Sequence, residues 1–224
     1  MSAAAAAGAP FRLYSYWRSS CAWRVRIGLN LKGVEHEYVP VHLTRGGGAQ
    51  NTAEYQEKNP LRTVPLLEWE EDGKLQRLSQ SMAILVFLEE RYPAPPLWPR
   101  DPLLKAQAWM LAEIPNSGIQ PLQNLVVTQK VKNELGGDGN AWAREWNERG
   151  LAALEGWARP LAGKFMLGDS VTVADVYLVP QLYGARRFGV DLAPFPTLTR
   201  VEKTCEVLDA FARARPERQP DAEK

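Results

Sequence analysis

Residues 11–32 read FRLYSYWRSSCAWRVRIGLNLK and contain the first two elements of the predicted fold. The residues at 11–17 are mostly aromatic and apolar, which predicts a strand. The apolar positions over 21–32 predict a helix that ends at Lys32-Gly33, where the glycine suits a C-terminal cap. Two serines at positions 19 and 20 stand between these elements. The stretch therefore predicts a strand–loop–helix unit.

The following residues extend this unit into a small α/β domain. A second strand is expected over 37–43 and a short polar helix over 52–58. Strand candidates at 66–69 and 75–78 flank the turn Glu71-Asp72-Gly73, which favours a hairpin. A helix is expected over 81–91. The predicted order is βαβα followed by ββα.

The pattern changes after a proline-rich segment at 92–99, which is typical of a linker between domains. Helical periods then dominate, and we expect helices near 102–135, 140–162, 172–187 and 196–214, followed by a loose polar tail from Pro216. The predicted organisation is a disordered alanine-rich extension at 1–10, an α/β domain at 11–91, a linker at 92–99 and an all-helical domain at 100–224.

Composition excludes several classes of function. The chain has 224 residues and a net charge of +1, from 27 basic and 26 acidic side chains, which does not support nucleic acid or a membrane surface as a partner. Two distant cysteines and two histidines make a disulfide framework or a metal site improbable. Without an export signal or an apolar span, we expect a cytoplasmic protein.

The junction between the first strand and helix is the first candidate site. A helix N-terminus offers unpaired amide donors and positive potential, and it stabilises anions, including a thiolate. Ser19 or Ser20 can donate a hydroxyl hydrogen to that thiolate. The alternative is that one of these serines is simply the N-cap of the helix.

Two more polar loops follow strands or precede helices in the same domain. Val64-Pro65 can hold a cis bond that leaves the backbone of Val64 ready to pair with an extended peptide; the alternative is an ordinary trans proline at a strand edge. Gln80 and Ser81 precede a helix and can hold a carboxylate, or can be a plain cap. Together the three loops suit a small anionic peptide with a thiol.

The residues at 19–27, SSCAWRVRI, closely resemble the signature of zeta-class glutathione transferases. The resemblance continues in Asn59-Pro60, Val64-Pro65 and Gln80-Ser81, and beyond the linker at 118–124, 187–192 and 219–221. It spans nearly the whole chain after Pro10. It implies a thioredoxin-like N-terminal domain, an all-α C-terminal domain, a homodimer, and glutathione as cofactor.

The resemblance also implies roles for individual residues. Ser19 is the first choice for the hydroxyl that faces the thiolate, Ser20 is the second, and Cys21 is an alternative catalytic group. The residues expected to bind glutathione are these three together with Gln50, Val64, Pro65, Gln80, Ser81, Gln120 and Asn124. Arg18 and Arg187 are candidates for gripping substrate carboxylates, because a guanidinium pairs with them in bidentate fashion; a surface ion pair is the alternative for both.

The activity that the resemblance implies is the cis–trans isomerisation of maleylacetoacetate to fumarylacetoacetate by reversible thiolate addition, a step of tyrosine and phenylalanine catabolism. Close alternatives are maleylpyruvate isomerisation and glutathione-dependent dehalogenation of α-halo acids. Gln120 and Leu125 favour maleylacetoacetate, because related maleylpyruvate enzymes carry histidine and arginine there. A non-catalytic glutathione-binding or stress-response protein is a further alternative, which the intact Ser19-Ser20-Cys21 argues against.

One acidic residue of the helical domain has a structural role. Thr172 and Asp175 have the spacing of a capping box, and Val171 and Val176 that of a hydrophobic staple. Asp175 is therefore expected to support folding, and we do not count it as catalytic.

Overall fold

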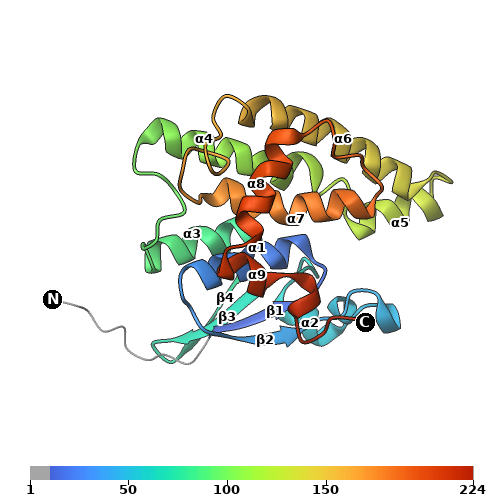
Figure 1. Ribbon diagram of the computed structural model, residues 1–224. Coiled ribbons are helices and arrows are strands. Elements are labelled where there is room, and N and C mark those ends of the chain that lie inside the picture. Colours follow the sequence, from blue (N-terminus) through green and yellow to red (C-terminus); the bar gives the residue numbers. More distant parts are fainter. Residues whose placement is uncertain (1–10, 224) are drawn as a thin grey trace. The chain divides into compact units, whose positions relative to one another are not determined.

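The computed structural model describes residues 11–223, and the predicted extension at 1–10 lies outside them. Contacts divide the described chain into two compact units, one comprising residues 11–95 and 213–223 and the other residues 96–212 (Figure 1). The predicted helical domain at 100–224 thus includes a tail whose contacts are made with the first unit.

The first unit is built on a four-stranded mixed sheet with the strand order β2-β1-β3-β4. Its elements in chain order are β1 (Phe11–Ser15), α1 (Ser20–Leu31), β2 (His36–Pro40), α2 (Ala53–Lys58), β3 (Leu66–Glu71), β4 (Lys74–Ser79) and α3 (Ser81–Arg91). Strand β1 pairs with β2 in parallel and with β3 in antiparallel orientation. This confirms the predicted order and the thioredoxin-like class of the unit, although β2 ends three residues earlier than expected.

Side chains alternate between the two faces of the sheet, as the period of a strand requires. Phe11 and Leu13 of β1 belong to a buried cluster with Val25 and Leu29 of α1 and with residues of α3. Tyr14 belongs instead to a second cluster, which includes residues of α2 and of the loops after β1 and before β3. The second cluster therefore joins the loop after β1, which precedes Ser19, to the loop that contains Val64.

The second unit is helical. It contains α4 (Pro102–Glu113), α5 (Leu125–Asn133), α6 (Gly139–Ala158), α7 (Val173–Arg187) and α8 (Pro196–Glu206), and α9 (Asp209–Ala214) follows them in the chain. Contacts join α4 to α7, α5 to α6, and α7 to α8. The capping box of Thr172 and Asp175 is present at the start of α7, as predicted.

Two helix predictions and one tail prediction were wrong. The segment 102–135 is not one helix: a π-helical stretch at Ile114–Ile119 and a turn through Pro121 separate α4 from α5, because a proline has no backbone N–H to continue the hydrogen-bond ladder. The segment 196–214 divides into α8 and α9. The tail is not loose, since Pro216–Arg218 forms a 3₁₀ turn and Asp221 makes two hydrogen bonds to the first unit.

Candidate functional site

Ser19 is the N-cap of α1. Its backbone is extended, and its Oγ accepts a hydrogen bond from the backbone N–H of Ala22 at 3.2 Å. A serine hydroxyl has one hydrogen to donate and two lone pairs, so this bond leaves its hydrogen available. Ser19 can therefore cap α1 through its oxygen and still donate a hydrogen bond to a thiolate.

The loop before Ser19 is held by a buried arginine that the sequence interpretation did not assign to the site. Arg26, only 2% exposed, donates from Nη1 to Ser15 Oγ at 3.0 Å and from Nη2 to the carbonyl of Trp17 at 2.9 Å. Burial lowers the pKa of Arg26 from 12.5 to about 10, so the guanidinium is still charged at neutral pH. An arginine within a run of buried apolar positions was the signal available in the sequence.

A second buried arginine joins the starts of two helices. Nη1 of Arg24 lies 3.8 Å from Cys21 Sγ and 3.4 Å from Ser81 Oγ. Arg24 is completely buried, and Ser81 is 4% exposed. The N-termini of α1 and α3 therefore converge on one cationic group, which adds to the positive potential of two helix ends.

The Val64–Pro65 peptide bond is cis, as predicted. The preceding loop is fixed by Tyr55 Oη and Asn59 Nδ2, which both donate to the carbonyl of Thr63, at 2.7 and 2.8 Å. Within residues 11–223, no hydrogen bond engages the backbone N–H or C=O of Val64. The side chain of Val64 belongs to the same buried cluster as those of Trp17 and Ala22, so this loop lies beside the start of α1.

Gln80 has a strained backbone directly before α3. Its φ of 73° and ψ of 118° lie in a region that non-glycine residues rarely adopt, and its side chain makes no capping bond. Such strain persists where the surrounding structure enforces it and is concentrated at ligand-binding positions. The carboxylate site expected at Gln80 and Ser81 stays a prediction.

Gln50 lies in the short 3₁₀ turn Ala49–Asn51. Its Nε2 donates to the carbonyl of Leu43 at 3.1 Å. Its buried Oε1 has no hydrogen-bond partner among the described residues. A buried acceptor without a partner costs free energy, and the assignment of Gln50 to the glutathione site stays a prediction.

Arg18 does not extend freely into solvent. Its guanidinium carbon lies 4.6 Å from the centre of the Trp17 ring, and its Nη2 donates to Tyr16 Oη at 3.3 Å. The cation–π contact therefore holds the Arg18 guanidinium against the Trp17 ring.

Gln120, Asn124 and Arg187 belong to the second unit. Asn124 is the N-cap of α5 and accepts from the backbone N–H of Val126 at 3.1 Å. Arg187 is the last residue of α7. The predicted residues of the first unit thus lie in four segments: contacts link the starts of α1 and α3 and the Val64 loop, whereas Gln50 lies in a separate turn that contacts Leu43. Gln120, Asn124 and Arg187 are placed by the helices of the second unit.

Buried amides, which the sequence interpretation did not single out, hold the connection that carries Gln120 and Asn124. Asn147 of α6 donates to Gln123 Oε1 at 2.5 Å, and Gln181 of α7 donates to Asn147 Oδ1 at 2.7 Å. All three amides of this network are less than a tenth exposed. The network fixes the 120–124 connection against α6 and α7.

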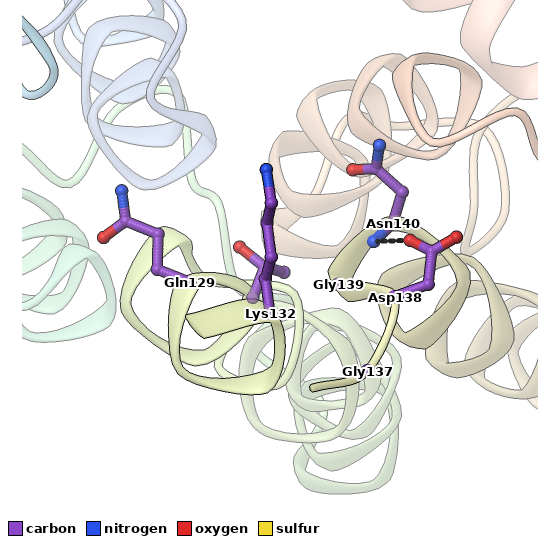
Figure 2. A pocket seen from close by; sticks show the side chains of 7 residues that line it. Gln129, Lys132, Gly137, Asp138, Gly139 and Asn140 are labelled. Atoms are coloured by element: carbon purple, nitrogen blue, oxygen red, sulfur yellow. Dashed lines mark hydrogen bonds between the residues drawn. The ribbon is translucent and has the colours of Figure 1, made fainter. Parts of the chain in front are cut away.

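A surface cavity of the second unit contains none of the predicted site residues. It lies at the connection of α5 and α6 and is lined by Thr128, Gln129, Lys132, Gly137, Asp138, Gly139 and Asn140 (Figure 2). The carboxylate of Asp138 is already used, since it accepts from the N–H of Asn140 at 2.8 Å as the cap of α6. Another hollow lies along α8, around Arg200 and Lys203.

Residues 11–223 contain neither a metal-binding cluster nor a membrane-spanning helix. They contain no group of three or more histidine, cysteine or acidic side chains arranged to hold a metal ion. In the same part of the chain, no helix combines the length and apolar character needed to cross a bilayer.

The family model for the glutathione S-transferase N-terminal domain matches residues 18–91, and that for the C-terminal domain matches residues 141–209. The maleylacetoacetate isomerase of Mus musculus is 46% identical over 96% of both chains. A solved structure of a maleylpyruvate isomerase, described as a bacterial zeta-class glutathione S-transferase, is 40% identical with a TM-score of 0.88, and covers 95% of this chain and 100% of its own.

The chain belongs to the zeta-class glutathione transferases. Another member, the maleylacetoacetate isomerase of Anaeromyxobacter dehalogenans 2CP-1, was solved with glutathione bound in its active site. It is 53% identical to this zeta-class chain with a TM-score of 0.88, and covers 96% of this chain and 98% of its own. The predicted family and fold class are therefore confirmed.

Proposed function

We propose that this zeta-class chain catalyses the glutathione-dependent cis–trans isomerisation of maleylacetoacetate to fumarylacetoacetate. The observation that carries the proposal is the hydroxyl of Ser19 at the N-terminus of α1, beside the converging start of α3. Relatives with 46–53% identity over nearly the whole chain carry the name maleylacetoacetate isomerase. The activity belongs to the breakdown of tyrosine and phenylalanine.

The polar groups of the first unit fit glutathione. The backbone N–H and C=O of Val64 have no hydrogen-bond partner within residues 11–223, which suits pairing with the extended cysteinyl part of the tripeptide. Gln80 and Ser81, with the amides at the start of α3, suit the γ-glutamyl carboxylate. Gln50, whose Oε1 has no partner among residues 11–223, is assigned to the glycine end. Gln120 and Asn124 complete the proposed set.

When bound, glutathione supplies the thiolate that adds to the cis double bond of the substrate and leaves again after rotation. The hydroxyl of Ser19 donates a hydrogen bond to that sulfur and stabilises it as the thiolate. The amides at the start of α1 and the charge of Arg24 favour the thiolate, lowering a pKa that is about 8.5 in a free thiol. Arg18 and Arg187 are assigned to the two substrate carboxylates.

The first prediction tests the activity directly. The purified chain should isomerise maleylacetoacetate in the presence of glutathione and show at most trace activity without it. Initial rates with maleylacetoacetate, maleylpyruvate and a 2-halo acid, each with and without glutathione, provide the measurement. We expect the largest kcat/KM for maleylacetoacetate, since Gln120 and Leu125 stand where related maleylpyruvate enzymes have histidine and arginine. A larger glutathione-dependent kcat/KM for maleylpyruvate would contradict the proposal and identify maleylpyruvate isomerisation as the activity.

A second prediction concerns recognition of the diacid. Arg187→Ala should raise KM for maleylacetoacetate far more than KM for glutathione. Loss of a charge-assisted bond costs about 1.5–3 kcal/mol, which corresponds to a fall of roughly 10- to 100-fold in kcat/KM. Steady-state kinetics with each substrate varied in turn, together with a melting curve, provide the measurement.

The neighbouring Arg186 is the matched control for Arg187. Its Nη1 donates to Glu202 Oε1 at 2.6 Å, so its role is an ion pair between α7 and α8. Arg186→Ala should lower the melting temperature and leave both KM values nearly unchanged. If Arg187→Ala behaves in the same way, Arg187 has no place in the substrate site.

We also propose a cytoplasmic homodimer, as the family resemblance implies. Residues 11–91 are proposed as the glutathione-binding domain, to which the helical domain adds Gln120 and Asn124. The helical domain at 100–224 is proposed as the substrate-binding domain, to which Arg18 is added. Sedimentation of the purified protein tests the dimer, and fractionation of the source cells tests the location.

A further inference from the structure

The C-terminal tail is bonded to the loop that precedes Ser19. Oδ2 of Asp221 accepts a hydrogen bond from the backbone N–H of Trp17 at 3.1 Å, and Oδ1 accepts one from the hydroxyl of Tyr38 at 2.6 Å. Burial, followed by this hydrogen bond to Asp221, raises the pKa of Tyr38, so the phenol remains a donor at neutral pH. A residue more than 200 positions away in sequence thus holds an amide two positions before the proposed thiolate donor.

This loop depends on side chains because the sheet does not hold it. Strand β1 ends at Ser15, so residues 16–18 have no ladder partner. The carbonyls of Tyr16 and Trp17 accept instead from Arg26, at 3.4 and 2.9 Å, and the N–H of Trp17 goes to Asp221. The buried guanidinium of Arg26 therefore fixes the two carbonyls of this loop, and the carboxylate of Asp221 fixes the N–H of Trp17.

The rest of the tail is anchored to the same region. The carbonyl of Ala214 accepts from Arg26 Nε at 3.2 Å, and Ala222 packs against the cluster that contains Tyr16 and Trp17. Glu223 pairs with His42 at 2.8 Å. The tail is thus tied to this part of the first unit at its beginning and at its end.

We propose that Asp221 is a positioning residue for catalysis, which sets the backbone of residues 17–19 so that the Ser19 hydroxyl faces the glutathione sulfur. The proposal rests on the proposed function in giving Ser19 that role. The backbone N–H of Ser19 donates to the carbonyl of Tyr16 at 2.9 Å, so a shift at Trp17 is transmitted to Ser19 through one tight turn. A displacement of about 1 Å at a reacting group is enough to lower a rate by about 100-fold.

The test uses the full chain with Asp221→Ala, and Asp221→Asn as the conservative variant. In the ligand-free protein, hydrogen exchange of the Trp17 amide should accelerate at least about tenfold in Asp221→Ala, because a fixed amide loses its acceptor. With glutathione added, the absorbance of the thiolate is measured as a function of pH. In Asp221→Ala the pKa of the bound thiol should be about one pH unit higher than in the parent chain, which is a tenfold weaker preference for the thiolate. The value of kcat should fall more than KM for glutathione rises. Asp221→Asn keeps an oxygen acceptor for Trp17 and should recover most of each effect.

Glu223→Gln is the matched control, because it removes another acidic group from the same tail. Glu223 pairs with His42 and Arg45 and, in the part of the chain that the structure describes, makes no hydrogen bond to residues 15–19. It should leave the Trp17 amide, the thiol pKa and kcat nearly as in the parent chain. The proposal is overturned if Asp221→Ala remains folded and leaves both the amide exchange and the thiol pKa unchanged. If Ser19→Ala is fully active, the proposed role of Ser19 is wrong. Hydrogen exchange of the Trp17 amide in the ligand-free protein still shows whether the tail positions the loop before Ser19.

Discussion

Ser19→Ala is expected to lower kcat for isomerisation by roughly 100- to 1,000-fold, the usual effect of removing a hydrogen-bond donor aimed at a negative charge in an active site. Ser19 stands at the N-terminus of α1, and its hydroxyl hydrogen is available while Oγ caps Ala22. Glutathione should still bind, because the groups of Val64, Gln80 and Ser81 are unchanged. Steady-state kinetics and binding calorimetry provide the two measurements.

The same substitution removes a helix cap, which costs about 1 kcal/mol of stability. A melting curve must therefore accompany the kinetics. Ser19→Thr restores a hydroxyl and a cap and should recover part of kcat, whereas a purely structural role predicts recovery of the melting temperature alone. A folded Ser19→Ala chain that retains most of its kcat would transfer the donor role to Ser20.

Cys21 serves as a comparison within the same turn of helix. Its Sγ lies 3.8 Å from Arg24 Nη1, and the side chain is partly exposed. If its thiol is only a neighbour of glutathione, Cys21→Ala should retain substantial isomerase activity in the assay used for Ser19. A folded Cys21→Ala chain that binds glutathione but is inactive would give the cysteine the larger role.

Asp175→Ala is expected to destabilise the chain by about 3–5 kcal/mol, since it leaves buried donors without an acceptor. The carboxylate is fully buried and accepts from the backbone N–H groups of Met166 and Thr172, each at 2.8 Å. It also accepts from Thr172 Oγ1 at 3.2 Å. Denaturant unfolding at neutral pH, measured by far-ultraviolet circular dichroism, gives the change.

The pH dependence separates the charge of Asp175 from its hydrogen bonds. Burial raises the pKa of Asp175 from its usual 3.8 to about 6, so between these values the folded chain binds a proton that the unfolded chain has lost. The stability contributed by this proton is fully present below the lower value and is lost as the pH rises through the higher one. Asp175→Asn should remove that slope and keep the bond to Met166. If the Asp175→Asn variant keeps the same dependence of stability on pH, that dependence belongs to another titrating group.

Local patterns predicted much of both units. Alternating apolar positions such as Phe11 and Leu13 identify β1 because a strand has one buried position in two. Ser19, Thr172 and Asp175 were identifiable as capping residues because a cap acts within one turn of its own helix. The sequence also indicated the cis bond at Val64–Pro65, which the structure contains.

The remaining differences have a local and a long-range cause. The break between α4 and α5 is local: Pro115 and Pro121 interrupt the hydrogen-bond ladder, but the helical periodicity of their neighbours predicted one continuous segment. The polar tail looked loose because its acidic residues find partners such as Trp17 and Tyr38 only after the sheet has formed.

The sequence alone therefore determined the family, the order of elements around β1 and α1, and the polar residues of three loops, since motifs and helix ends are encoded by neighbours in the chain. Only the tertiary structure showed that Arg24 joins Cys21 to Ser81 and that Arg26 and Asp221 hold the loop before Ser19. A buried guanidinium or a tail carboxylate acquires its role from partners that are distant in sequence. Those partners are defined by packing, which periodicity and spacing do not encode.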